Sequence, residues 1–125
     1  MLVTWLLAAA VASSSTTVVR WEPLGLSGGG SMYTPAISPV DPKFMMVNCD
    51  MSDAFLSEDG GANWRMIHHS QLRGNTACRP AFHPVDRNVI FAATGWSGGL
   101  AVSYDAGASW APLGQELNFH LPEYF

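Results

Sequence analysis

The stretch Ser57-Glu58-Asp59-Gly60-Gly61-Ala62-Asn63-Trp64 decides the fold, because it recurs as Ser103-Tyr104-Asp105-Ala106-Gly107-Ala108-Ser109-Trp110. Both copies read S-x-D-x-G-x-x-W, and an apolar run precedes each of them. In such a turn the Asp accepts hydrogen bonds from backbone N–H groups, the Gly supplies a positive φ, and the Trp packs back over the hairpin. Each copy is predicted to join two strands, and we call residues 57–64 and 103–110 the two repeat turns.

The repeat turns belong to a longer repeat. Pro35–Pro42 aligns with Pro80–Arg87, and Phe44–Val47 aligns with Val89–Ala92. A period in the forties built from short strands is typical of β-propeller blades of four strands each. The expected fold is all-β, a partial β-propeller of about two four-stranded blades plus an N-terminal closing strand. The predicted strands are 33–37, 44–49, 53–57 and 63–67 in the first blade and 79–82, 89–93, 100–103 and 109–113 in the second.

Part of the repeat also occurs near the N-terminus. Trp21–Gly25 and Trp110–Gly114 both read W-x-P-L-G, which places Trp21 at the position of Trp64 and Trp110. No repeat turn precedes Trp21, so its strand is predicted to complete the last blade of a ring and to close it. Residues 20–114 are accordingly assigned to an incomplete propeller, and 115–125 to the start of a further blade or a truncated tail.

Two blades cannot close a ring, because propellers usually have four to eight. The chain is therefore expected to be a fragment, a truncated gene product or a protein that assembles with copies of itself, with the fragment favoured. In each case the remaining propeller blades are needed to cover the apolar faces of the two blades present.

The first residues suggest export. Residues 1–12 contain an apolar run too short to span a bilayer, and they end in Ala10-Val11-Ala12, an A-x-A cleavage pattern. They are predicted to be a signal peptide, followed by a polar spacer at 13–19. The protein is expected to be secreted or periplasmic, with no membrane association after signal removal. A buried N-terminal strand or a frayed tail is the alternative.

Composition excludes several kinds of function. The 125 residues carry a formal net charge of −4, and 13% of them are charged. No basic run is interleaved with aromatic residues, so nucleic acid is not an expected partner. The two cysteines lack a C-x-x-C spacing, so no metal site and no cofactor is predicted.

Cys49 and Cys78 are instead candidates for a disulfide. Cys49 ends a strand of the first blade and Cys78 opens the first strand of the next, and the strand directions place both at one face of adjacent blades. Export would supply the oxidising environment that a disulfide needs. The alternative is that each cysteine is simply buried in its strand.

The repeat turn resembles the Asp box, or BNR repeat, which lies on the propeller blades of sialidases, glycoside hydrolase family 74 and sortilin-type receptors. Over residues 20 to about 114, the order of a Trp strand, a Gly-rich turn, a Pro-x-Asp-Pro turn and an Asp box is similar to the N-terminus of family 74. Those enzymes, xyloglucanases and their relatives, have two seven-bladed propellers with a cleft between them. The resemblance implies an O-glycosyl hydrolase for a β-glucan or xyloglucan-type polysaccharide. It gives a structural role to the Asp-box residues Ser57, Asp59, Gly61, Trp64, Ser103, Asp105, Gly107 and Trp110.

The same resemblance singles out Asp50. In family 74 a first-blade strand ends in Thr-Asp-x-Gly-Gly, and its Asp is a catalytic carboxylate. Asp50 falls on that position, and Ser52 and Asp53 replace the two glycines. Asp50 is thus implied to be the general base of an inverting mechanism, with the acid partner missing from this chain. The alternative is a turn residue that hydrogen-bonds its own loop.

Strand direction predicts which residues share a face with Asp50. Because the strands of a blade alternate in direction, the loops after the second strands and the connection between the blades lie on one face, and the repeat turns lie on the other. Trp96, Arg73 and Asn75 are therefore candidate substrate-binding residues, since a stacking aromatic and polar donors beside a carboxylate suit a sugar. Trp96 covering the blade edge is the alternative for that residue.

Two other functions stay open. A non-catalytic propeller that binds glycan or protein, as in sortilin-like receptors, and a purely structural repeat are both compatible with the repeat turns. Sialidase activity is not supported, because the chain lacks an F/Y-R-I-P motif.

Overall fold

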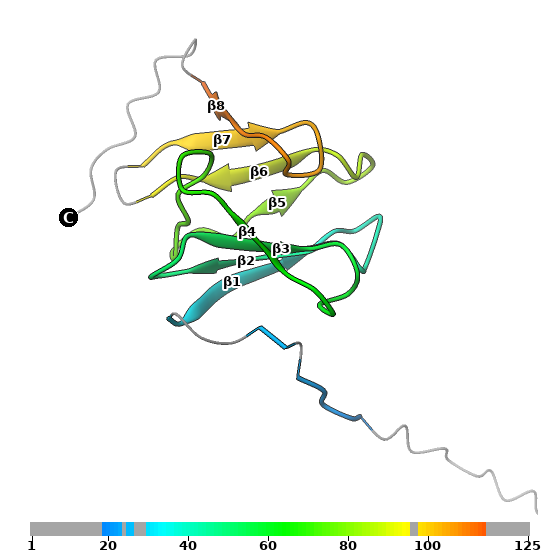
Figure 1. The fold of residues 1–125 in the computed structure, drawn as a ribbon. Helices are drawn as coiled ribbons and strands as arrows, with labels where there is room; N and C mark the ends of the chain where they lie inside the picture. The colour runs from blue at the N-terminus through cyan, green and yellow to red at the C-terminus, as the bar shows by residue number, and fades with distance from the viewer. Residues whose placement is uncertain (1–18, 24, 27–29, 96–97, 115–125) are drawn as a thin grey trace, which may run out of the picture.

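The computed structural model describes residues 19–23, 25–26, 30–95 and 98–114. Within these residues the chain is all-β and forms two four-stranded antiparallel sheets, each a simple meander (Figure 1). The strands are β1 (Met32–Ile37), β2 (Met45–Cys49), β3 (Ala54–Ser57), β4 (Arg65–Ile67), β5 (Ala81–Phe82), β6 (Ile90–Ala93), β7 (Leu100–Ser103) and β8 (Ala111–Leu113). All eight predicted strands are present within two residues of their expected bounds, as two blades of a partial propeller require.

The two sheets repeat each other in register. Met46 pairs with Leu56 between β2 and β3, and their equivalents Phe91 and Val102 pair in the same way between β6 and β7. The pairings of β3 with β4 and of β7 with β8 also correspond. Each side chain therefore has an equivalent on the same face of the other sheet, because successive strand residues point to opposite faces.

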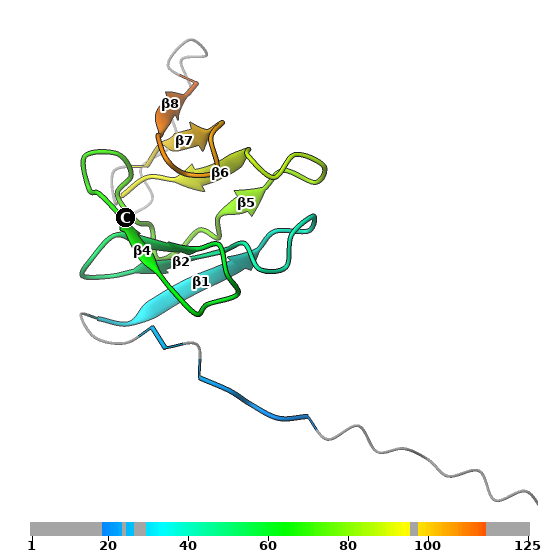
Figure 2. The ribbon, with the colours of Figure 1, turned by 45° about the vertical axis from the view of Figure 1, so that its right-hand side comes forward.

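The core lies between the two sheets, which stack on each other (Figure 2). Apolar side chains from one face of each sheet meet there, together with residues of the adjoining loops. The cluster consists of Phe44, Met46, Ala54, Leu56, Ile67, Leu72, Ile90, Ala92 and Ala101. Phe44 also meets Phe82 edge to face, with ring centroids 5.1 Å apart. This burial, at about 25 cal/mol per Å² of apolar surface, is the main force that holds the sheets together.

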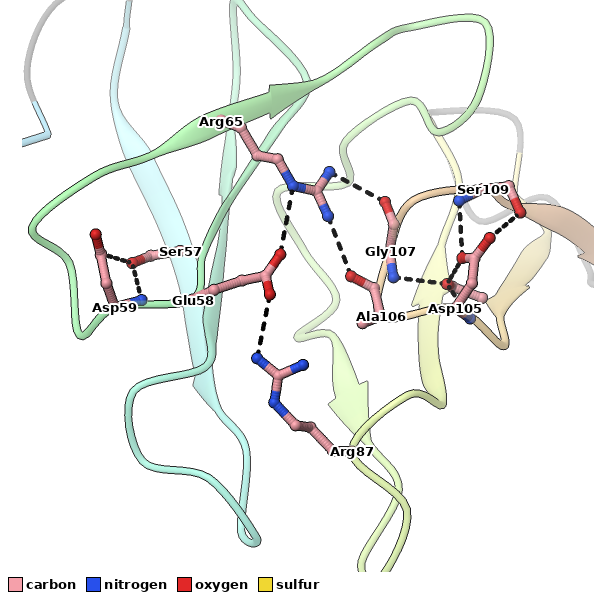
Figure 3. A network of polar contacts seen from close by, with 10 residues as sticks. Ser57, Glu58, Asp59, Arg65, Arg87, Asp105, Ala106, Gly107 and Ser109 are labelled. Carbon is pink, nitrogen blue, oxygen red and sulfur yellow. Dashed lines mark hydrogen bonds and ion pairs between the residues drawn. The ribbon is translucent and has the colours of Figure 1, made fainter.

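Arg65 joins the first sheet to the repeat turn of the second (Figure 3). Its Nη1 and Nη2 donate to the backbone carbonyls of Gly107 and Ala106, each at 3.1 Å. A Cβ on Gly107 would lie 2.6 Å from Leu56 Cδ1, and the φ of Gly107 is +79°. Glycine is therefore required both for the turn and for the close approach of the two sheets.

Arg87 makes a second bridge between the sheets. Its Nε lies 2.8 Å from Asp41 Oδ2, its Nη2 lies 3.2 Å from Glu58 Oε2, and its guanidinium stacks 4.3 Å above the centre of the Phe44 ring. The hydrogen bond from Arg87 lowers the pKa of the Asp41 carboxyl below its usual value. Glu58 also lies 3.9 Å from Arg65 Nε, so one carboxylate connects the two arginines (Figure 3).

The predicted N-terminal closing strand is not formed in the described residues, and the last blade that it would complete is not one of the two described sheets. Residues 19–23 form no strand, and Trp21 is 92% exposed. An outer strand needs a three-stranded sheet with an open edge, and both described sheets already have four strands. Trp21 also lacks the preceding turn over which Trp64 and Trp110 fold back.

Several predicted segments lie outside the described residues. These are the signal peptide at 1–12, all but the last residue of the spacer at 13–19, the tail at 115–125 and Trp96. In the described part of the chain, no helix has the length and hydropathy needed to cross a membrane.

Candidate functional site

Three segments meet at one end of the sheets: the β2–β3 loop (50–53), the β4–β5 connection (68–80) and the described part of the β6–β7 loop (94–95 and 98–99). Gly95 N–H donates to the carbonyl of Arg73 at 3.0 Å, and Asn75 Nδ2 donates to the carbonyl of Gly95 at 2.7 Å. The predicted grouping of these loops on one face is confirmed by these contacts. We call this end of the molecule the loop end.

Asp50 is exposed at the loop end, on the β2–β3 loop. Its Oδ1 accepts a hydrogen bond from the Ser31 N–H at 2.9 Å, and its own N–H donates to the Ser31 carbonyl at 3.3 Å. These two bonds hold Asp50 against the segment that precedes β1. Beside it opens a hollow of about 460 Å³, lined by Cys49, Asp50, Met51, Asp53, His69, Arg73, Gly74 and Gly95.

The β2–β3 loop stays tight although it lacks the two glycines of the family motif. Cys49 N–H donates to the Asp53 carbonyl at 2.7 Å, and Asp53 has a φ of +64°. Glycine adopts this left-handed conformation freely and Asp tolerates it, so Asp53 takes over the backbone role of a glycine. A Cβ on Gly74 would overlap the Asp53 carbonyl, so the β4–β5 connection needs glycine where it crosses this loop.

Asn75 supports the loop end from inside. Its Oδ1 accepts hydrogen bonds from the N–H groups of Ala77 and Cys78, both at 2.9 Å, while its Nδ2 binds Gly95. Both ends of its amide are thus engaged by backbone groups, and the predicted substrate contact stays a prediction.

Asn48 is a structural residue that the sequence reasoning missed. It is 2% exposed in β2, and its Nδ2 donates to the Asn75 carbonyl at 2.7 Å, to the Cys78 carbonyl at 3.2 Å and to Thr34 Oγ1 at 2.9 Å. It therefore ties the first sheet to the β4–β5 connection. The sequence does contain a sign of this role: an amide side chain lies within a run of otherwise apolar strand residues. Such an amide is buried and needs hydrogen-bond partners.

Of the predicted substrate-binding residues, Arg73 is brought to the hollow with Asp50. Asp53 and His69 also line this hollow, and neither was predicted to do so. The ring of His69 lies 4.3 Å from that of His68, whose Nδ1 is 2.7 Å from Ser70 Oγ. Among the described residues, no three His, Cys, Asp or Glu side chains group as metal ligands would.

The predicted disulfide is not formed: no bond joins Cys49 and Cys78 in the described part of the chain. Asn48 points its amide at the Cys78 carbonyl, and the next side chain along a strand points to the opposite face. Cys49 is accordingly buried on the far side of β2, whereas Cys78 is exposed.

The two repeat turns lie at the opposite end of the strands, as predicted, since Ser57 pairs with Met45 and Ala54 with Asn48. In the first turn Asp59 Oδ1 accepts from Ser57 Oγ at 3.0 Å and from Asn63 N–H at 2.8 Å. Hydrogen bonds from Asn63 lower the pKa of the Asp59 carboxyl below its usual value.

The second turn repeats these contacts. Asp105 Oδ1 accepts from Ser103 Oγ at 2.8 Å and from Ser109 N–H at 2.8 Å. Hydrogen bonds from Ser109 and Ser103 lower the pKa of Asp105 to about 2. One difference is that Trp64 Nε1 donates to the Gly61 carbonyl at 3.0 Å, whereas the buried Trp110 Nε1 has no hydrogen-bond acceptor among the described residues.

Comparison with known proteins gives a fold and no family assignment. No protein-family model matches the chain, and no curated protein matches it. Among solved structures, it is similar to the crystal structure of an ancestral GH74 enzyme, with 23% sequence identity and a TM-score of 0.58. The similarity covers 79% of this chain and 12% of that one. The chain thus has a GH74-like fold and spans about an eighth of that enzyme's length.

Proposed function

We propose that this chain forms part of the substrate-binding face of an exported glycoside hydrolase acting on a β-glucan or xyloglucan-type polysaccharide. The observation that carries the proposal is the hollow of about 460 Å³ in which Asp50 lies with Arg73 and His69. An open hollow with a carboxylate and several hydrogen-bonding groups suits a polysaccharide, whose hydroxyls need many partners. The likeness in fold to a GH74 enzyme supports the same proposal.

In this proposal Asp50 is the general base. It takes a proton from the water that attacks the sugar, while a carboxylic acid on the other side of the bond protonates the leaving oxygen. Inversion requires the two carboxyl groups to lie about 6.5–9.5 Å apart, and further blades supply the acid. The Ser31 N–H orients Asp50 by fixing its Oδ1.

The two repeat turns act as structural Asp boxes in this proposal. Their carboxylates are engaged by Ser57 and Asn63 in one turn and by Ser103 and Ser109 in the other. They stabilise their hairpins at the end of the sheets away from Asp50, so they take no part in the chemistry.

The test is the Asp50→Asn substitution in the complete protein, with its further blades present. Asparagine keeps an oxygen for the Ser31 N–H and cannot act as a base, so xyloglucan hydrolysis should fall at least about a hundredfold while the fold and glycan binding persist. Asp86→Asn is the matched control: Asp86 is exposed and its carboxylate accepts from the Asn88 N–H at 2.9 Å. Full hydrolysis by Asp50→Asn would remove Asp50 from the mechanism.

The second candidate is a non-catalytic propeller that binds glycan or protein, or a repeat with a purely structural role. The hydrogen bond between Ser31 and Asp50 favours it, because a turn residue commonly binds nearby backbone in this way. Glycan binding without any hydrolysis, unchanged by Asp50→Asn, would support this candidate.

A further inference from the structure

Each sheet keeps one apolar face that the other sheet does not cover, on which Val47 and Val102 are buried and other large side chains are exposed. On the outer face of the first sheet, Ile37 is 60% and Met66 54% exposed, and on that of the second, Leu100 is 48% and Leu113 38% exposed. Large apolar groups gathered on a sheet face mark an interaction surface. We call these the first outer face and the second outer face.

The repeat matches the two outer faces to the two sides of the interface between the sheets. When the two sheets are aligned by their strand pairings, residues of the second outer face correspond to those by which the first sheet contacts the second. Phe91, Val102, Leu100 and Leu113 stand at the places of Met46, Leu56, Ala54 and Ile67. Conversely, residues of the first outer face correspond in this alignment to those by which the second sheet contacts the first. Met45, Val47 and Phe55 stand at the places of Ile90, Ala92 and Ala101.

We propose that copies of this chain associate head to tail, with the second outer face of one copy packed on the first outer face of the next. The contact between the two sheets inside one chain provides the geometry, because each junction repeats it with equivalent positions. Such a heterologous contact forms a ring where its rotation closes. With the two described blades from each copy, rings of four to eight blades correspond to two to four copies. The proposal does not depend on Asp50 or on glycan binding.

The junction between copies differs from the internal interface in its charges. Arg65, which binds the turn carbonyls across the internal interface, is replaced by Ala111 at the equivalent position. Arg87, which bridges Asp41 and Glu58, is replaced by Pro42 in the aligned segment. The contact between copies therefore lacks both arginine bridges, with Asp86 at the place of Asp41, and raising the salt concentration should not weaken it.

Sedimentation velocity of the 125-residue chain over a wide concentration range tests the proposal. The wild type should form species of two to four copies that persist at high salt. Met66→Glu on the first outer face and Leu100→Glu on the second should each weaken this association at least about tenfold, because an apolar contact is lost and a carboxylate is desolvated. Val85→Glu, at a 79% exposed turn residue outside both faces, should associate as the wild type does.

Mixing the two single variants tests the head-to-tail arrangement directly. Met66→Glu retains the second outer face and Leu100→Glu retains the first, so an equimolar mixture should form a one-to-one dimer and nothing larger. This rescue also shows that both variants are folded. An exclusively monomeric wild type would overturn the proposal, as would monomers that associate only after removal of residues 115–125. Association of either variant at the wild-type affinity, or a mixture that gives no dimer, would equally contradict it.

Discussion

Arg65 Nη1 lies 3.1 Å from the backbone carbonyl oxygen of Gly107, across the boundary between the two sheets. Arg65 is in β4 of the first sheet, and Gly107 is in the repeat turn of the second. A single side chain thus links one repeat unit to the turn that defines the next.

Replacing Arg65 by Ala should loosen the sheet-to-sheet contact. Two carbonyls lose a charged donor, which ordinarily contributes about 1.5–3 kcal/mol, and the exposure of Arg65 reduces the expected loss to about 1–2 kcal/mol of unfolding free energy. Chemical denaturation measures this. Arg79→Ala, at another exposed arginine, should change stability by less than about 0.5 kcal/mol. Equal stability of the two variants would argue against the bridge.

The repeat turns should make stability fall in acid. Hydrogen bonds from Ser109 and Ser103 hold the pKa of Asp105 at about 2, below the unfolded value of about 3.9. A lowered carboxyl pKa stabilises the fold above the unfolded pKa, and this contribution is lost as the pH falls through the window from about 4 to about 2. Melting temperature should therefore decline over that window.

Asp105→Ala should be less stable than the wild type at neutral pH and should show a shallower decline between about pH 4 and 2. Ser109→Ala keeps the carboxylate and removes the largest cause of its lowered pKa, so it should give an intermediate slope. A wild-type slope in Asp105→Ala would mean that the turn carboxylate does not carry the effect.

Asp53 should accept glycine better than a β-branched residue. Its φ of +64° is free for glycine and costs an L-residue about 1–2 kcal/mol. Asp53→Gly should therefore stay within about 0.5 kcal/mol of the wild type, whereas Asp53→Val should lose about 2 kcal/mol or more. Asp53→Ala should fall between them, and the order is read from denaturation midpoints. Equal midpoints for the glycine and valine variants would exclude the left-handed conformation.

The sequence predicted the fold well because its signals are local and repeated. Two repeat turns, such as the one ending at Trp64, recur with a period in the forties. They suffice to locate eight strands and to predict which residues of each strand share a face. Strand direction then placed Asp50 and Arg73 at one end without any knowledge of packing. The strand predicted at Trp21 stays a prediction, because both described sheets already have four strands and the blade that it would complete is not one of them.

The site itself was only partly predictable, since it depends on which way individual side chains point. Cys49 and Cys78 lie at the same end, yet the alternation along β2 that aims Asn48 at Cys78 turns Cys49 away. The hydrogen bonds of the Asn75 amide to loop backbone were likewise not predictable from the sequence. Such partner choices arise from three-dimensional packing and leave no periodic signal in the chain.

An NMR titration of the chain with xyloglucan oligosaccharides tests directly whether the loop end carrying Asp50 binds glycan. Backbone amide shifts should move for residues 30–31, 49–53, 73–75 and 95, while those of the repeat turns at 57–64 and 103–110 should stay in place. Loss of these shifts in Arg73→Ala, with the spectrum otherwise unchanged, would locate the contact in the hollow. Shifts confined to the repeat turns, or none at saturating oligosaccharide, would show that the loop end does not bind glycan.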